Sequence, residues 1–213
     1  VKGARERAAR EREERVEAAL GALKEVEEKR NFKEAHSGGR KAKGEPRGST
    51  TDAEARNMRM ANGGFSPGFN VQFAADAANG AIVGVSVTNS GSDSGQAAGM
   101  VEQIEKRTGQ RPRDYLVDAA YTDKRSVDAL AAMDVTLYGA VPKRHGVDHF
   151  ATQATDSAAV SAWRKRMQTD DAKEIFKQRS ATIERVNADL RTYRTMDRML
   201  VRGIGKVRCV ALW

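Results

Sequence analysis

The segment FKQRSATIERVNADLR, residues Phe176–Arg191, determines how this chain is interpreted. Its composition predicts a helix, because it holds no Gly or Pro and many residues that favour helices. Glu184, Asn187 and Arg191 are spaced by three and four residues, so they share one face of that helix. Lys177 extends the same face. The helix therefore presents one carboxylate among basic and polar side chains.

The other faces of this helix hold its apolar residues and a further arginine. Ile183, Val186 and Leu190 form an apolar face that we expect to pack on a sheet. Glu184 would then lie beside the sheet without being buried among apolar side chains. Arg179, five residues before Glu184, points elsewhere and could meet a phosphate or brace a neighbouring helix.

A second acid, Asp118, closes the short apolar run Tyr115–Val117, which predicts a strand. Ligands of open α/β sheets gather at the carboxyl ends of strands, and the small residues Ala119 and Ala120 leave room there. Two magnesium ions about 3.5–4 Å apart can clamp the attacking and leaving oxygens of a displacement at phosphorus. Asp118 and Glu184 together therefore predict a two-metal site for phosphoryl transfer on nucleic acid.

Each acid also has a simpler interpretation. A strand-end Asp often caps a helix or occupies a turn. A Glu on a basic helix often forms an ion pair, here with Arg185 or Arg191. Two carboxylates are also not quite enough for the usual two-metal design, in which a third carboxylate bridges both ions. It is the combination of Asp118 with Glu184 that favours a catalytic site.

The charge of the chain favours a polyanionic partner. The formal net charge is +8 and the isoelectric point is about 9.7. Residues 161–213, which include the basic helix, hold 13 Lys and Arg against 6 Asp and Glu. The alternative is a merely well-solvated surface.

The single cysteine, Cys209, lies in an apolar run and predicts a small buried side chain, with no disulfide within the chain. The sequence contains no apolar run long enough to span a membrane and no signal peptide, so we expect a reduced, cytosolic setting. The chain starts at Val1 and stops at Trp213 inside an apolar run, so we expect a fragment of a longer protein.

The N-terminal part differs from the rest. Residues 4–30 are dense in Arg, Glu and Ala and predict a long amphipathic helix. Its narrow apolar stripe consists of Val16, Ala19, Leu20, Leu23 and Val26. This helix could pair with a partner helix or be a solvated edge. Residues 31–66 look like a loop that contains a short capped helical turn at 49–54.

The middle of the chain predicts alternating strands and helices. Asn79-Gly80 joins two alternating runs as a tight hairpin turn. The expected strands are 70–75, 82–87, 115–117 and 135–141, and the expected helices are about 97–108, 123–133, 157–167 and 171–193. The first of these helices is expected to be capped by residues 90–94. This order predicts an α/β fold with one mixed sheet and crossover helices.

Five segments together resemble the DDE transposases of bacterial insertion sequences, which have an RNase H-like catalytic core. These segments are Ser49–Arg56, Gly68–Gln72, Leu116–Tyr121, Phe176–Arg191, and Gly203 with Lys206–Trp213. The likeness covers most of residues 49–213 and leaves 1–48 as a charged helical insertion and linker. It implies that Asp118 is the second catalytic Asp and Glu184 the catalytic Glu, and that both bind metal.

The sequence also departs from the family pattern. Phe176 stands where Tyr is usual and Arg191 where Lys is usual, and four residues rather than three separate Arg179 from Glu184. The family's first catalytic Asp should lie on a strand before the charged helix, and its DNA-binding region earlier still. Asp52 and Asp76 could substitute for that acid, but a cap and a turn residue are the simpler interpretations. His145 and His149 are interpreted as solvated loop residues.

The resemblance implies a DNA transposase core that cleaves the element's ends and joins them to target DNA. It implies two Mg²⁺ or Mn²⁺ ions, a homodimer in the complete enzyme, and a cytoplasmic, nucleoid-associated bacterial protein. Arg179, Asn187, Arg191 and Lys177 would position DNA phosphates. Lacking the first Asp, the fragment is expected to bind DNA without cutting it. The alternatives are a non-catalytic nucleic-acid-binding module of the same fold and a self-associating helical protein organised by residues 4–30.

Overall fold

The computed structural model describes the chain except residues 1, 37–43, 61–62, 144–145, 147 and 197. The chain divides into two compact units. The first unit comprises residues 1–71, 87–91 and 199–213, and the second comprises 72–86 and 92–198. The domain boundary predicted between residues 48 and 49 lies inside the first unit and stays a prediction.

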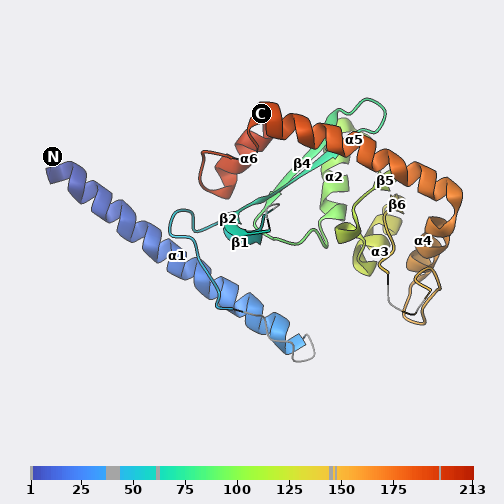
Figure 1. The fold of residues 1–213 in the computed structure, drawn as a ribbon, viewed down its shortest axis with the longest axis horizontal. Coiled ribbons are helices and arrows are strands. Elements are labelled where there is room, and N and C mark those ends of the chain that lie inside the picture. Colours follow the sequence, from blue (N-terminus) through green and yellow to red (C-terminus); the bar gives the residue numbers. More distant parts are fainter. Residues whose placement is uncertain (1, 37–43, 61–62, 144–145, 147, 197) are drawn as a thin grey trace. The chain divides into compact units, whose positions relative to one another are not determined.

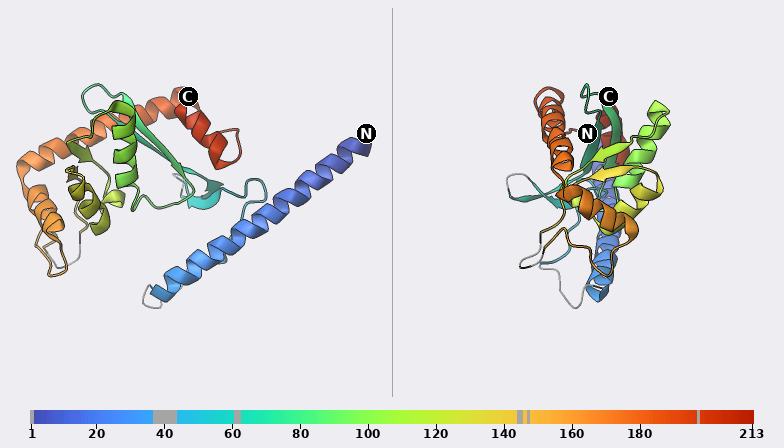
Figure 2. Two further views of the ribbon diagram at one scale, coloured as in Figure 1. Left: turned by 180° about the vertical axis from the view of Figure 1, so that it is seen from behind. Right: turned by 90° about the vertical axis from the view of Figure 1, so that its right-hand side faces the viewer.

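In the first unit, helix α1 spans Lys2–His36, longer than the sequence predicts. Figure 2 shows it from two sides as one continuous helix. Ala19 is its one buried side chain among the described residues of the helix, and Gly48 lies against the Ala19 carbonyl. Val16 and Leu20 are exposed, so only part of the predicted apolar stripe is covered.

The predicted loop at 31–66 contains a hairpin that the sequence did not indicate. Strand β1 (Arg56–Arg59) pairs antiparallel with β2 (Phe65–Gly68). Both strands are short and have few buried side chains, so neither shows the apolar alternation of a half-buried strand. Residues 49–54 form turns rather than a helix, with the Ser49 hydroxyl accepting from the Asp52 amide.

Helix α6 (Ile204–Leu212) completes the first unit and buries Val207 and Ala211. Cys209 is exposed, so the prediction that it is buried was wrong. Its position two residues after Val207 turns it by about 200° around the helix, away from the buried face.

Most of the predicted hairpin belongs to the second unit, and in it β3 (Asn70–Ala75) pairs with β4 (Ile82–Thr88). Its turn is wider than a two-residue turn, because the Asp76 amide donates to the Ala81 carbonyl. Helix α2 (Ala97–Thr108) packs on β4 at Gly84, where an added Cβ would lie 2.6 Å from the Met100 sulfur. The helix starts after Gln96 and carries no side-chain cap, unlike the prediction from residues 90–94.

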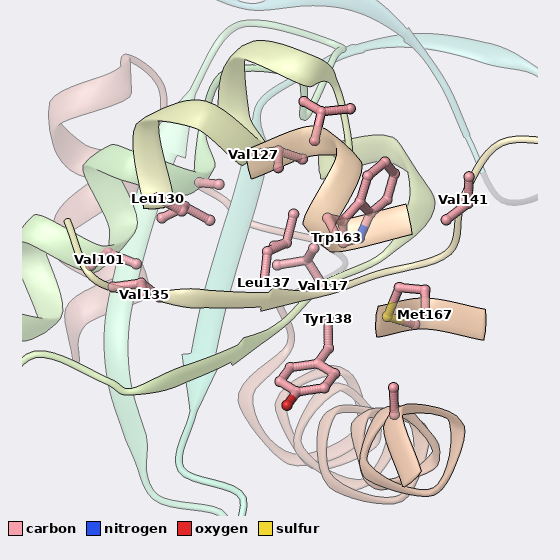
Figure 3. Close-up of a cluster of buried hydrophobic side chains, with 13 residues drawn as sticks. Val101, Val117, Val127, Leu130, Val135, Leu137, Tyr138, Val141, Trp163 and Met167 are labelled. Carbon is pink, nitrogen blue, oxygen red and sulfur yellow. The ribbon is translucent and has the colours of Figure 1, made fainter. Parts of the chain in front are cut away.

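The core of this unit is a parallel βαβ element. Strand β5 (Asp114–Leu116) pairs in parallel with β6 (Thr136–Tyr138), and α3 (Lys124–Ala132) connects them. Figure 3 shows Trp163 of α4 (Ala158–Gln168) directed into the cluster beside Leu137 and Val117. Helix α5 (Asp170–Arg194) follows α4 after the cap residue Thr169. The predicted helices 157–167 and 171–193 are thus confirmed to within a residue or two.

The described strands form three two-stranded sheets instead of the single mixed sheet predicted from their order. Strands β5 and β6 have three residues each, which is shorter than predicted. Short strands leave few backbone groups to extend a ladder to a third strand. The fold is therefore α/β with small sheets, and its RNase H-like arrangement stays a prediction.

Candidate functional site

Asp118 follows the buried Val117, which comes directly after strand β5. The Val117 amide donates to the Tyr138 carbonyl at 2.9 Å, which continues the β5–β6 pairing up to this point. The Asp118 carboxylate caps the short 3-10 helix Ala119–Tyr121 by accepting from the Ala119 amide at 3.1 Å. Its side chain is nevertheless 66% exposed. Asp118 thus caps the short helix, as the simpler interpretation predicts, and still presents an open, solvent-facing carboxylate.

Thr122 holds the turn after Asp118 in place, a role that sequence reasoning missed. This residue is buried, and its hydroxyl donates to the carbonyls of Ala119 and Ala140. Gly139 makes this approach possible, because a Cβ there would lie 2.4 Å from the Thr122 methyl group. Neither residue belongs to a charged or catalytic pattern, so the sequence offered no signal for them.

Arg179 of α5 faces Asp118. Its Nη2 lies 3.7 Å from Asp118 Oδ1, and its side chain is 23% exposed. The guanidinium sits over the ring of Phe176, 5.6 Å from the ring centroid. The Arg179 Nε is buried with no hydrogen-bond partner in the described part of the chain. Helix α5 therefore reaches the strand-end acid through an arginine.

Glu184 lies on the exposed side of α5, while Val186 is buried on the opposite side. The structure shows no ion pair of Glu184 with Arg185 or Arg191 among the residues it describes. Glu184 lies five positions after Arg179, which is about 7.5 Å along the helix axis. The contact between Arg179 and Asp118 therefore does not by itself bring Glu184 to Asp118.

The other predicted DNA-contacting residues share the accessible side of α5. Asn187 is half-buried and Arg191 is exposed. Lys177 is exposed and forms a short ion pair with Glu174 one turn earlier. Figure 1 shows α5 passing the turn of the β3–β4 hairpin, and an added Cβ at Gly80 would meet the Arg185 guanidinium there.

Two tyrosines near Asp118 are held in the neutral form. Burial raises the pKa of Tyr115 far above its ordinary value. Burial also raises the pKa of Tyr121, and the negative charges of Asp93 and Asp118 raise it further. The Asp118 carboxylate therefore disfavours the ionised form of Tyr121, and it faces the guanidinium of Arg179.

The side chains present do not form a complete metal site. Carboxylate oxygens are the donors that Mg²⁺ and Mn²⁺ prefer, and Asp118 and Glu184 are both accessible. However, the described ranges contain no group of three or more His, Cys, Asp or Glu side chains arranged to hold an ion. Asp118 is instead turned toward the cation of Arg179. The predicted two-ion site is thus not assembled in this arrangement.

Asp52 is used elsewhere, as a helix cap. Asp52 Oδ2 accepts from the Gly203 amide at 2.8 Å, and Glu54 Oε2 accepts from the Ile204 amide at 2.9 Å. Two carboxylates thus cap the start of α6, where the helix dipole favours negative charge. The cap interpretation of Asp52 is correct, but the helix it caps lies 151 residues further along the chain.

The remaining candidates have ordinary local roles. Asp76 starts the β3–β4 turn, where its carbonyl accepts from the Gly80 amide at 2.8 Å. His149 is half-buried, its ring lies against Phe150, and its carbonyl accepts from Arg164. His145 lies outside the described residues.

Comparison with known proteins places the chain in a family. The family model described as "Transposase DDE domain" matches residues 36–213. No curated protein and no solved structure matched the chain. In the residues described, no helix is long and apolar enough to cross a membrane. Because the family model covers most of the sequence, including Asp118 and the whole of α5, the chain belongs to the transposase DDE domain family.

Proposed function

We propose that this chain is the DNA-binding part of a transposase catalytic core, with Asp118 and Glu184 as two of its acidic residues. The observation that carries this proposal is the meeting of α5 with the end of β5, through Arg179 and Asp118. A strand-end carboxylate and a basic helix that bears a second exposed carboxylate are the parts that phosphoryl transfer on DNA requires. Family membership supports the same function.

The complete enzyme would cut at the ends of its element and join the freed 3′-hydroxyl to target DNA. Enzymes of this family use divalent metal ions, Mg²⁺ or Mn²⁺. Since the described side chains gather no group of three ligands, we expect this chain alone to bind DNA without cutting it. Robust magnesium-dependent nicking by the purified chain that disappears in Glu184→Gln would contradict this expectation.

DNA binding would rely on the phosphate backbone. Lys177, Arg179, Asn187 and Arg191 are the side chains of α5 that we expect to face phosphates, with little reading of base sequence. Each phosphate contact displaces condensed cations, so affinity should fall steeply as salt rises.

The test is fluorescence anisotropy with a labelled duplex at several salt concentrations. Arg191→Gln should weaken binding to all duplexes alike and reduce the slope of log K against log salt by about one. The matched control is Arg107→Gln, which removes the same charge from the exposed last turn of α2. Equal effects of the two substitutions would mean that net charge alone, rather than α5, determines binding.

A second candidate function is a non-catalytic nucleic-acid-binding module of the same family. The absence of an assembled metal site in the described residues favours it. In that case DNA affinity would be indifferent both to Asp118→Asn and to added Mg²⁺. The transposase proposal predicts instead that Mg²⁺ tightens DNA binding in the wild-type chain and that Asp118→Asn removes this gain.

A homodimer in the complete enzyme remains part of the proposal. The exposed Val16 and Leu20 on α1 are compatible with a helix that pairs with a second copy. Sedimentation of the wild-type chain across a concentration range would test it.

A further inference from the structure

A cleft of about 290 Å³ is lined by α3, β6 and α4 in the second unit. Its walls are mostly apolar and include Val127, Leu137 and Ala162. Arg166 of α4 is the basic residue of the lining. Asp134 also lines the cleft, but it is exposed, so water and salt screen its charge. A small hollow with apolar walls and one cation is typical of a site for a small molecule.

The cleft lies away from the surroundings of Asp118. Thr136, which lines the cleft, begins β6 and is aligned with Asp114, the first residue of the parallel strand β5. Asp118 instead follows the last residues of β5. No residue of α5 proposed to contact DNA lines the cleft. Whatever binds here is therefore separate from the proposed DNA contact.

Arg166 carries a charge that no carboxylate of the described residues pairs with. Its Nη2 donates to the Leu137 carbonyl at 3.0 Å, and its guanidinium lies 5.5 Å from the ring centroid of Tyr138. Its Nε is buried without a hydrogen-bond partner in the described part of the chain. The acid whose charge acts on it, Asp114, forms its ion pair with Arg113. Burial lowers the pKa of Arg166 below its ordinary value, because the charged form loses hydration.

Arg164, two residues earlier on α4, shows the opposite arrangement. Its side chain is 6% exposed, and its Nε donates to Asp156 Oδ2 at 2.8 Å. Its Nη1 donates to the His149 carbonyl. A charge that leaves water is tolerated when it is paired and hydrogen-bonded in this way. Arg166 is partly removed from water without such a carboxylate, so the partner that it lacks is an anion.

We propose that this cleft binds an apolar carboxylate, with the carboxyl group of the ligand on Arg166. The apolar body of the ligand would lie against Val127, Leu137 and Ala162. A guanidinium offers two parallel N–H groups to a carboxylate, which fixes the orientation of the ligand. The apolar walls favour an organic acid over a strongly hydrated inorganic anion. This inference goes beyond the proposed function, because neither Asp118 nor the DNA-contacting residues of α5 take part.

The first test titrates the full 213-residue chain with isovalerate and follows the methyl resonances of Val127 and Leu137 by nuclear magnetic resonance. Both resonances should shift with a dissociation constant in the millimolar range, as expected for so small a ligand. Neutral isovaleramide has the same shape and should bind about tenfold more weakly, because it loses the charged pair. Acetyl-leucine presents the same chemistry as the carboxyl terminus of a polypeptide and is titrated in parallel.

Three variants assign the binding to the cleft. Arg166→Gln should weaken isovalerate binding about tenfold or more. Lys165→Gln is the matched control, since it removes the same charge from the exposed neighbouring position and should change affinity less than about twofold. Ala162→Leu fills the cleft and leaves the cation in place, so it should also abolish binding. Ala162 is exposed and Leu favours helices, so this variant should keep the wild-type melting temperature.

The outcomes decide each part of the inference. Equal binding of isovalerate and isovaleramide, or unchanged binding in Arg166→Gln, would overturn the pairing of a carboxylate with Arg166. Inorganic phosphate that binds as tightly as isovalerate would overturn the apolar character of the ligand. Unchanged isovalerate binding in Ala162→Leu, or resonances of Val127 and Leu137 that do not move, would overturn the site itself. Tighter binding of acetyl-leucine than of isovalerate would support the site with a chain terminus as its source, whereas weaker binding would support it with a free small acid.

Discussion

Helices α1 and α3 were both predicted from the spacing of apolar residues, yet they are stabilised in different ways. In α3, with nine residues, Ser126, Val127 and Leu130 are buried in the core of the second unit. In α1, with 35 residues, Ala19 is the buried side chain among those described. Apolar spacing thus predicts that a helix forms, whereas burial depends on what else in the chain covers it.

The largest effect is expected at Trp163, which is 1% exposed in the core that also holds α3. Trp163→Ala should lower the free energy of unfolding by about 3–5 kcal/mol, since the cavity is too large for its neighbours to fill. Urea denaturation followed by circular dichroism measures this change. Trp213→Ala is the matched control, because Trp213 is fully exposed at the end of α6. Similar losses in both variants would contradict the described core.

A smaller effect is expected at Asp156, whose ion-pair partners Lys124 and Arg164 belong to α3 and α4 of the same unit. Asp156 has a fully buried side chain, with Lys124 Nζ at 2.7 Å and Arg164 Nε at 2.8 Å. The hydrogen bond from Lys124, the amide of Gln153 and the charge of Arg164 lower the pKa of Asp156 to about 2, despite burial. The unfolded chain has the ordinary value of 3.8. The contribution to stability is therefore present above about pH 4 and is lost as pH falls toward 2.

Asp156→Asn should lower the melting temperature at pH 7 and flatten its decline between pH 4 and pH 2. Differential scanning calorimetry over this pH range measures both changes. Asp189→Asn, on the exposed side of α5, is the control and should leave the melting temperature nearly unchanged. If the melting temperature of Asp156→Asn declines between pH 4 and pH 2 with the wild-type slope, other carboxylates cause the acid sensitivity.

The features that the sequence could predict depend on neighbouring residues, whereas those that it could not predict depend on distant segments. The order of elements from β3 to α5, the place of Asp118 at a strand end and the extent of α5 follow from local patterns, whereas helix α6 was not predicted. The exposed Glu184 and the buried Val186 follow from helical spacing. These features need only neighbours in the sequence, and they were predicted nearly as observed.

Features that depend on distant segments were missed. The contact of Arg179 with Asp118 joins residues 61 positions apart and depends on one arginine rotamer. The capping of α6 by Asp52 and Glu54 joins residues about 150 apart. Strands β1 and β2 carry no apolar alternation. No periodicity or composition encodes such pairings, so single-sequence reasoning could not locate them.

A moderate effect is expected at the cap of α6. Asp52→Asn and Glu54→Gln remove the charges that accept from the Gly203 and Ile204 amides, and each should destabilise the start of the helix by about 0.5–1 kcal/mol. Hydrogen exchange at the amides of Val207–Ala211 should accelerate accordingly. Glu45→Gln, an exposed acid in the same unit, is the control. Unchanged exchange in the double variant would mean that α6 is held only by Val207 and Ala211.

The smallest effect is expected on α1 itself. Leu20 is 55% exposed, so Leu20→Gln should change the free energy of unfolding by less than about 0.5 kcal/mol. Leu130→Ala, in the core, should by comparison cost about 2–5 kcal/mol. Sedimentation of the same two variants adds a second measurement. If Leu20→Gln dissociates an oligomer while leaving each chain folded, the exposed apolar residues of α1 form a contact between copies. Loss of self-association together with unchanged DNA binding would then assign assembly to this face of α1 and place the DNA contact elsewhere, because a single interface serving both would lose both at once.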